Sequence, residues 1–213
     1  MNGHIETVNI FDEHYEEYEA WYDNHEFAFL SEVKALKMAL PEKGKGLEIG
    51  AGTGRFAASL GIADGIDPST KMLELARQKG VDVKLGNGEK LSFPDNAFDY
   101  VAIINTLCFV KEPIMVLKEA GRVLRTNGKI IIGIIDRNNF LGRFYQEKKS
   151  RFYKHAHFFT AEEVVELLRQ TGFKKFSFWQ TLFAFPDEIS EIEKPMEGFD
   201  RGGFVVIRAE ISN

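Results

Sequence analysis

The chain has 213 residues, of which 44% are hydrophobic and 28% charged, and this is the composition of a globular protein that can bury a substantial core. Its net charge of -5 argues against nucleic acid as the main partner, because phosphate binding requires a basic surface. The only cysteine, Cys108, excludes an internal disulfide framework and favours a reducing, cytoplasmic location.

The N-terminal segment, residues 1–43, is rich in aromatic and acidic side chains and lacks a targeting pattern or a membrane-spanning run. Tyr15, Tyr18 and Tyr22 recur on one face of a predicted helix. In one interpretation this helix packs on the core. In the other it forms a lid over a positively charged ligand, because aromatic faces attract cations. Tyr18 and Trp21 are the residues that we expect such a lid to bring to a ligand.

A glycine-rich turn follows the first predicted strand, which ends at Ile49. Glycines at positions 50, 52 and 54 let the backbone turn sharply and bring its N–H groups close to a ligand. A helix begins near Gly54, and its unpaired N–H groups would favour a carboxylate or a phosphate. The dinucleotide fingerprint G-x-G-x-x-G would require glycine at position 55, which is arginine.

From Gly46 onward predicted strands and helices alternate, which indicates a parallel sheet with helices on both faces. The predicted strands are 45–49, 62–66, 82–85, 98–104, 129–135, 173–179 and 204–210. The predicted helices are 26–40, 54–60, 69–79, 113–125 and 160–171.

Three local signals refine this pattern. Gly128 is interpreted as the stop of the helix before it, and Thr160 with Glu163 as a capping box. Residues 136–159 and 180–203 are predicted to be irregular, and loops of that length are usually functional. We expect a single domain over 1–213, with 1–43 as a helical lid and 44–213 as the core.

One polar position at a strand end points to a ribose. Asp67 ends the second strand, where a carboxylate can accept both hydroxyls of a ribose, although it could also cap the next helix. Asn87 follows the third strand in a stretch that could be a plain glycine-rich turn. Met72 could be a core methionine.

These stretches resemble, in order, the motifs of the class I S-adenosylmethionine-dependent methyltransferases, of the small-molecule type. The glycine turn fits E-x-G-x-G-x-G, the segment from Asp67 to Leu73 is similar to D-x-S-x-x-M-L, and Gly86 to Glu89 resembles G-D-A-E. The resemblance implies a three-layer, Rossmann-like α/β fold with a seven-stranded, mostly parallel sheet, its last strand antiparallel, and N-terminal helices. It also implies that S-adenosylmethionine is the cofactor, that the Asn87 carbonyl accepts from the adenine amino group, and that Met72 lines the adenine pocket. The cofactor-binding residues that it implies are Glu48, Gly50, Ala51, Gly52, Thr53, Gly54, Asp67, Pro68, Met72, Asn87, Gly88, Glu89 and Asn105, with Tyr18 and Trp21 from the lid.

The sequence also offers candidates for a general base. His155 and His157 could take a proton, or could be held by hydrogen bonds alone, and no Cys/His/Asp cluster completes a metal site around them. Tyr145 and Asp136 are further candidates. Aromatic side chains suited to a small organic acceptor also lie in this part of the chain: Phe140, Phe144, Tyr145, Phe152, Tyr153, Phe158 and Phe159.

The sequence therefore predicts a methyltransferase acting on a small-molecule acceptor, with an amine as one candidate. An NAD-type oxidoreductase and a cofactor-binding module without turnover are the alternatives. We expect a cytoplasmic monomer or homodimer with no nucleic-acid or membrane partner.

Overall fold

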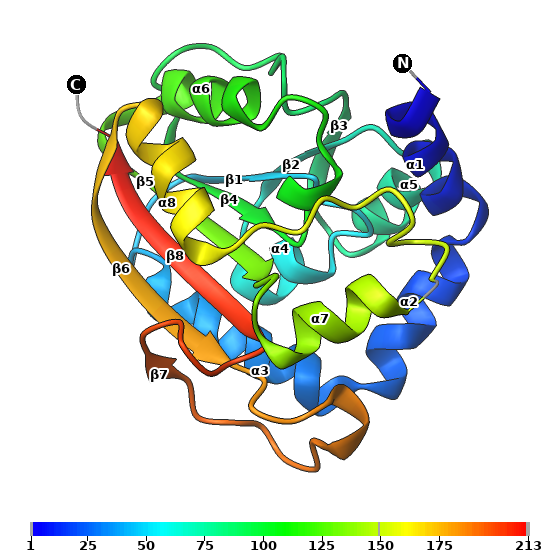
Figure 1. The fold of residues 1–213 in the computed structure, drawn as a ribbon. Helices are drawn as coiled ribbons and strands as arrows, with labels where there is room; N and C mark the ends of the chain where they lie inside the picture. The colour runs from blue at the N-terminus through cyan, green and yellow to red at the C-terminus, as the bar shows by residue number, and fades with distance from the viewer. Residues whose placement is uncertain (1, 149, 212–213) are drawn as a thin grey trace.

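In the computed structural model, which describes residues 2–148 and 150–211, a twisted sheet lies between two layers of helices (Figure 1). The strand order is β3-β2-β1-β4-β5-β8-β6-β7. The strands are β1 (Gly46–Ile49), β2 (Asp64–Asp67), β3 (Asp82–Leu85), β4 (Phe98–Ile104), β5 (Leu124–Ile135), β6 (Phe173–Thr181), β7 (Met196–Glu197) and β8 (Phe204–Ile211).

Strands β1 to β5 pair in parallel, whereas β8 runs antiparallel between β5 and β6. This confirms the predicted fold class. The one addition is β7, which pairs with the edge strand β6 through two residues. A strand of two residues carries no periodic signal, so the sequence pattern could not indicate it.

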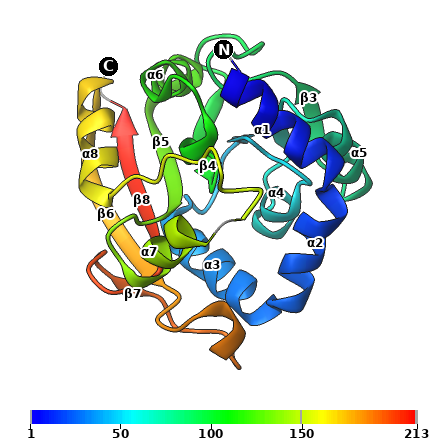
Figure 2. The ribbon, with the colours of Figure 1, turned by 45° about the vertical axis from the view of Figure 1, so that its right-hand side comes forward.

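Helices α3 (Glu26–Ala39), α4 (Arg55–Leu60) and α5 (Thr70–Gln78) cover one face of the sheet, and α6 (Pro113–Val123) and α8 (Ala161–Gln170) cover the other. Helices α1 (Asn2–Glu13) and α2 (Tyr15–Asn24) stand beside α5 and α4, away from β6 and α8 (Figure 2). Helix α7 (Phe140–Glu147) follows β5.

The middle of the sheet is buried on both faces, as expected for strands between two helical layers. Along β4, Tyr100, Ala102 and Ile104 pack into the core beneath α3, whereas Val101 and Ile103 pack into the core beneath α6. A strand with two such faces holds its carboxyl end rigidly, and that end contributes to the cavity described below.

Three predicted boundaries are wrong. The N-terminal segment forms three helices, because the chain breaks at His14 and again at His25. Helix α6 ends at Val123 instead of residue 125, and β5 begins at Leu124 instead of residue 129, because Leu124 is already extended and pairs with Phe98. The stretch 136–159, predicted to be irregular, contains α7, which Asn139 caps by accepting from the Gly142 amide at 3.1 Å.

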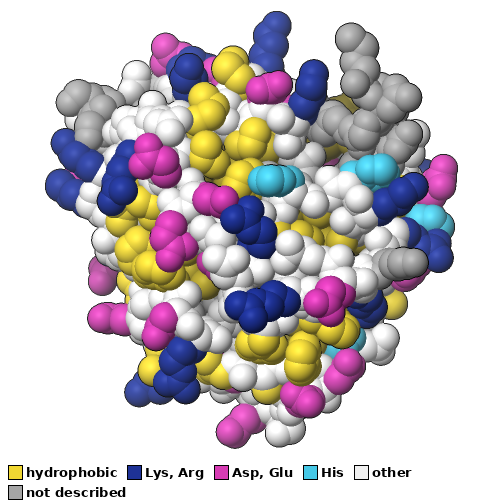
Figure 3. All heavy atoms as spheres, viewed as in Figure 1, with side chains coloured by type: hydrophobic (Ala, Val, Ile, Leu, Met, Phe, Trp, Pro, Cys, Tyr) yellow, Lys and Arg dark blue, Asp and Glu magenta, His cyan; other side chains and the backbone are white. Residues whose placement is uncertain are grey.

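None of the helices in the described ranges combines the length and apolar character that a membrane span requires. On the face of the molecule seen in Figure 3, acidic and basic side chains are interspersed, with hydrophobic ones between them. That face therefore presents no broad surface of a single charge sign.

The capping box of α8 is present as predicted. The Thr160 hydroxyl accepts from the Glu163 amide at 3.2 Å, and the Glu163 carboxylate accepts from the Thr160 amide at 2.9 Å. We expect Thr160→Ala to lower the free energy of unfolding by about 1 kcal/mol, because the Glu163 amide loses the hydroxyl that accepts its hydrogen bond. Urea denaturation measures this. Thr160→Ser should retain the stability, and equal stability of the alanine variant would contradict the assignment.

Candidate functional site

A cavity of about 440 Å³ lies at the carboxyl ends of the parallel strands, a size typical of small-molecule sites. Its wall includes Ile49 from β1, Asp67 from β2, Asn105 after β4 and Ile134 from β5. This is the edge at which parallel α/β sheets bind ligands.

The turn between β1 and α4 depends on the glycines at its two ends. Gly50 has φ +75°, and a Cβ there would lie 2.2 Å from Thr106 Cγ2. The hydroxyl of Thr106 donates to the Gly50 carbonyl at 3.2 Å, so the turn is fastened to the end of β4. Gly54 has φ +74°, and a Cβ there would lie 2.9 Å from the Cα of Ala76 on α5. Gly54 does not line the cavity, so its lack of a side chain serves the close packing against α5 and not contact with a ligand.

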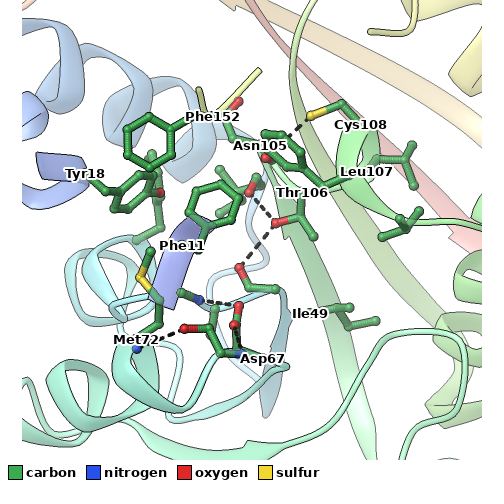
Figure 4. Close-up of a pocket in the computed structure, with 18 of the residues that line it drawn as sticks. Phe11, Tyr18, Ile49, Asp67, Met72, Asn105, Thr106, Leu107, Cys108 and Phe152 are labelled. Carbon is green, nitrogen blue, oxygen red and sulfur yellow. Dashed lines mark hydrogen bonds between the residues drawn. The ribbon is translucent and has the colours of Figure 1, made fainter. Parts of the chain in front are cut away.

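Asp67 joins two turns beneath the cavity. Its Oδ2 accepts from the Gly52 amide at 2.8 Å and its Oδ1 from the Ser69 amide at 2.8 Å (Figure 4). Ser69 is the residue that caps α5, accepting from the Met72 amide at 3.2 Å, so Asp67 does not have that role. Burial raises the pKa of Asp67 to about 6, although the two amides favour its charged form. Each carboxylate oxygen keeps a second lone pair for a ligand.

The other predicted cofactor residues also line the cavity, with the single exception of Gly54. They are Glu48, Gly50, Ala51, Gly52, Thr53, Pro68, Met72, Asn87, Gly88, Glu89, Asn105, Tyr18 and Trp21. Asn105 has φ +50°, a conformation that asparagine tolerates, and its amide donates to the Gly133 carbonyl at 2.9 Å.

Buried polar atoms of the cavity wall are predominantly acceptors. Glu32 Oε2, Glu48 Oε2, Glu89 Oε2 and Asn105 Oδ1 have no hydrogen-bond partner among the described residues. Burial raises the pKa of Glu48 well above its usual range. Buried acceptors without donors are unfavourable, so this wall fits a ligand that carries ammonium, hydroxyl and amino donors.

Each cationic side chain of the described lining already has a partner: Arg55 pairs with Glu19 at 2.9 Å, Arg151 with Glu17 at 3.7 Å, and Lys148 lies over the ring of Phe144 at 5.4 Å. A pyrophosphate would therefore meet acidic groups here without unpaired cations to offset its charge. The polar groups of the wall fit the donors of S-adenosylmethionine better than a dinucleotide.

Helices α1 and α2 are held on the core by acidic side chains. Glu19 accepts hydrogen bonds from Thr53, from Arg55 at 2.9 Å and from Lys79 at 2.9 Å. Asp12 accepts from the Ser69 hydroxyl at 2.5 Å. Both contacts end on turns of the cavity wall, so these helices cover the same turns that are predicted to hold the cofactor.

Helices α1 and α2 and the segment after α7 form a cover over the cavity, and aromatic rings make up much of it. Phe11 lies 5.7 Å from Tyr18 and 5.4 Å from Phe152, measured between ring centroids, and Figure 4 shows these three rings grouped at one side of the cavity. Five of the seven aromatic residues expected around an acceptor line the cavity: Tyr145, Phe152, Tyr153, Phe158 and Phe159. Phe140 and Phe144 instead pack against Phe185.

Only one of the predicted bases lines the cavity. Tyr145 lines the cavity, but His155, His157 and Asp136 do not. The amide of His157 donates to the Cys108 carbonyl at 2.8 Å, and its ring packs on Phe159. Asp136 accepts from the amides of Asn138 and Ala161, so it joins β5 to the start of α8. A direct proton transfer from a cavity-bound molecule to these three side chains is not supported by this placement.

Phe11 and Glu32 line the cavity, but neither of them was assigned to a site from the sequence. Glu32 carried a signal: Phe29, Val33 and Leu36 surround it at helical spacing, so it lies on the apolar face of α3. Among the described residues, no group of three His, Cys, Asp or Glu side chains is arranged to hold a metal ion.

Comparison with known proteins agrees with this geometry. A family model described as a methyltransferase domain matches residues 47–132. A crystal structure from Thermotoga maritima, described as an S-adenosylmethionine-dependent methyltransferase and possible histamine N-methyltransferase, is 48% identical; the match covers 96% of this chain and 99% of that one, with a TM-score of 0.93. The chain belongs to the class I S-adenosylmethionine-dependent methyltransferases.

Two further relatives extend the comparison. An uncharacterized protein of Methanocaldococcus jannaschii is 47% identical over 95% of this chain and 99% of its own length. The chloroplastic 2-methyl-6-phytyl-1,4-hydroquinone methyltransferase 2 of Oryza sativa subsp. japonica is 33% identical over 60% of this chain and 38% of its own length. The predicted cofactor, S-adenosylmethionine, and the predicted enzyme class are confirmed, and the oxidoreductase and binding-module alternatives are set aside.

The Glu19 contacts generate a prediction about the cover. Burial opposes ionisation of Glu19, but hydrogen bonds from Arg55, Thr53 and Lys79 lower its pKa. We expect Glu19→Gln to weaken these contacts and to speed amide hydrogen exchange in α2. The difference should shrink as the pH falls through the lowered pKa of Glu19, because the wild-type carboxylate is then neutralised as well.

Hydrogen exchange followed by mass spectrometry measures this effect. Glu16→Gln, on the exposed side of the same helix, is the matched control and should exchange like the wild type. Unchanged exchange in the Glu19 variant would show that the contacts do not hold the helix.

Proposed function

We propose that this methyltransferase acts on a small organic acceptor enclosed in the cavity, beside Asn105 and beneath the aromatic cover. The observation that carries the proposal is the cover itself. Helices α1 and α2 and the segment after α7 place aromatic side chains over the strand ends, and hydrogen bonds to Thr53 and Ser69 fasten it. An acceptor that reacts beneath such a cover has to be small and partly apolar.

The relatives support the same class of acceptor. The Thermotoga maritima protein is described as a possible histamine N-methyltransferase, and the Oryza sativa protein as a hydroquinone methyltransferase. Amines and phenols are therefore the first acceptors to test on this chain.

The cofactor would be held by the residues that line the strand ends. We assign the ribose hydroxyls to Asp67, the adenine to Asn87 and Met72, and the methionine part to Glu48 and Asn105. The assignment is supported by the free lone pairs of Asp67 and by the unpartnered buried acceptors among the others. When bound, the cofactor supplies a methyl group on a positively charged sulfur. The protein then has to orient the acceptor and exclude water, and Tyr18 and Trp21 would do the latter as part of the cover.

An acceptor screen tests the proposal. Purified protein is incubated with S-adenosylmethionine and a panel of small amines, including histamine, together with phenols, thiols and carboxylates. We expect formation of S-adenosylhomocysteine to rise with at least one class, with a methylated product seen by mass spectrometry. Methylation of protein or RNA substrates without turnover of any small acceptor would contradict the proposal.

The ribose assignment is tested with Asp67→Asn. Hydrogen bonds to a charged group contribute about 1.5–3 kcal/mol each, so we expect the affinity for S-adenosylmethionine to fall about tenfold or more. Because hydroxyl donors favour the ionised carboxylate, wild-type affinity should also fall as the pH drops below about 6, and the variant should lose this component.

Titration calorimetry at several pH values measures both effects. Asp64→Asn, at the other end of the same strand, is the control and should bind like the wild type. Thermal unfolding of each variant checks whether the two turns that Asp67 joins remain folded. A variant that stays folded and binds S-adenosylmethionine with wild-type affinity would overturn the assignment.

A further inference from the structure

Glu32 is a buried carboxyl of the cavity wall, and one of its oxygens is unused. It lies on α3, is 2% exposed, and lines the cavity wall. Its Oε2 has no hydrogen-bond partner among the described residues. A carboxylate in such a place is unfavourable unless a cation or a hydrogen-bond donor meets it.

Four tyrosines from three parts of the chain line the same cavity and interact electrostatically with this carboxyl. Tyr18 and Tyr22 come from α2, with their hydroxyl oxygens 3.4 Å apart. Tyr145 comes from α7 and Tyr153 from the segment after it, with ring centroids 4.9 Å apart. Burial raises the pKa of each tyrosine, and the charge of Glu32 raises it further. The hydroxyls therefore stay neutral, and together with Glu32 they offer oxygen acceptors and aromatic faces to a cation.

Asn105 connects this group to the proposed cofactor site. Its side chain interacts with Glu32 and favours the charged form of the carboxyl, and its own Oδ1 has no partner among the described residues. Asn105 follows β4, at the strand end where the cofactor is proposed to lie. The Glu32 group is therefore at the acceptor end of the cavity.

The described part of the wall does not supply a cation for Glu32, since Arg55, Lys148 and Arg151 already have the partners given above. The missing partner is a positively charged group on a ligand. Because the acceptor end of the cavity is aromatic as well as acidic, an organic ammonium group fits it better than a hydrated metal ion.

We propose that the methyl acceptor is a small amine whose ammonium group binds Glu32 among these tyrosines, and that Glu32 takes the proton that has to leave before methylation. The inference rests on the proposed function and names its substrate class. In this step an N–H bond of the ammonium breaks, an O–H bond forms on the Glu32 carboxylate, and the electron pair stays on nitrogen as the lone pair that methylation requires. Burial raises the pKa of Glu32 to about 8, which makes this carboxyl a better proton acceptor than an exposed glutamate.

Direct binding tests this separately from turnover. The protein is saturated with S-adenosylhomocysteine and titrated with phenethylamine and with histamine, and then with phenethyl alcohol, which has a hydroxyl in place of the amine. We expect at least one amine to bind about tenfold or more tightly than the alcohol, and Glu32→Gln to remove that advantage. The affinity for S-adenosylhomocysteine itself should be the same in this variant, which shows that the fold and the cofactor site are intact.

Glu26→Gln, exposed in the first turn of the same helix, is the matched control and should bind the amines like the wild type. Amines that bind no better than the alcohol, or equally well to Glu32→Gln, would overturn the inference. If the acceptor screen finds phenols or thiols and Glu32→Gln methylates them normally, the inference fails while the proposed function stands. If no small acceptor is methylated, both fail.

Discussion

The carboxylate of Asp67 accepts the amides of Gly52 and Ser69, and this pair of hydrogen bonds fixes two turns that come from different βα units. One turn leads from β1 into α4 and the other from β2 into α5. The rest of the cavity depends on that bridge. Gly50 lies close enough to Thr106 to fasten the first turn to β4, and Asp12 of α1 is bound to Ser69 of the second. A single buried carboxyl thus joins the two turns of the cavity floor, and through Ser69 it is linked to part of the cover.

Acidic side chains have three distinct roles around this cavity. Glu19 and Asp12 hold the N-terminal helices on the core, and Asp67 joins the turns beneath. Glu48 and Glu32 are buried with an unused oxygen each, which costs free energy in the absence of a ligand. Stability is therefore reduced where binding is needed, as is usual for sites that wait for a cationic partner. The positive charge of a sulfonium cofactor and of an amine would each offset part of this cost.

The sequence indicated those features that depend on local spacing. The glycine turn, Asp67 and Asn87 are set by motifs a few residues long, and the structure brings them to one cavity. The capping box at Thr160 is equally local. Helix α7 was missed because its eight residues lie in a stretch without a long apolar period, and its start is signalled only by Asn139.

Features that depend on tertiary packing were beyond the sequence pattern. The end of α6 is set by the pairing of Leu124 with Phe98 of β4, which lies far away in the chain. The burial of Glu32 depends on the packing of α2 and of the sheet against α3, and the placement of His157 outside the cavity accompanies its hydrogen bond to Cys108, which follows β4. Helical spacing marked Glu32 as unusual but could not say what it faces.

The most direct test of the central claim is a crystal structure of the complex with S-adenosylhomocysteine. We expect both ribose hydroxyls to donate to the outer lone pairs of Asp67 while the Gly52 and Ser69 amides keep their hydrogen bonds to the same carboxylate. A ribose bound elsewhere in the cavity, or an Asp67 side chain that turns away from it when the ligand binds, would contradict the claim that this bridge organises the site.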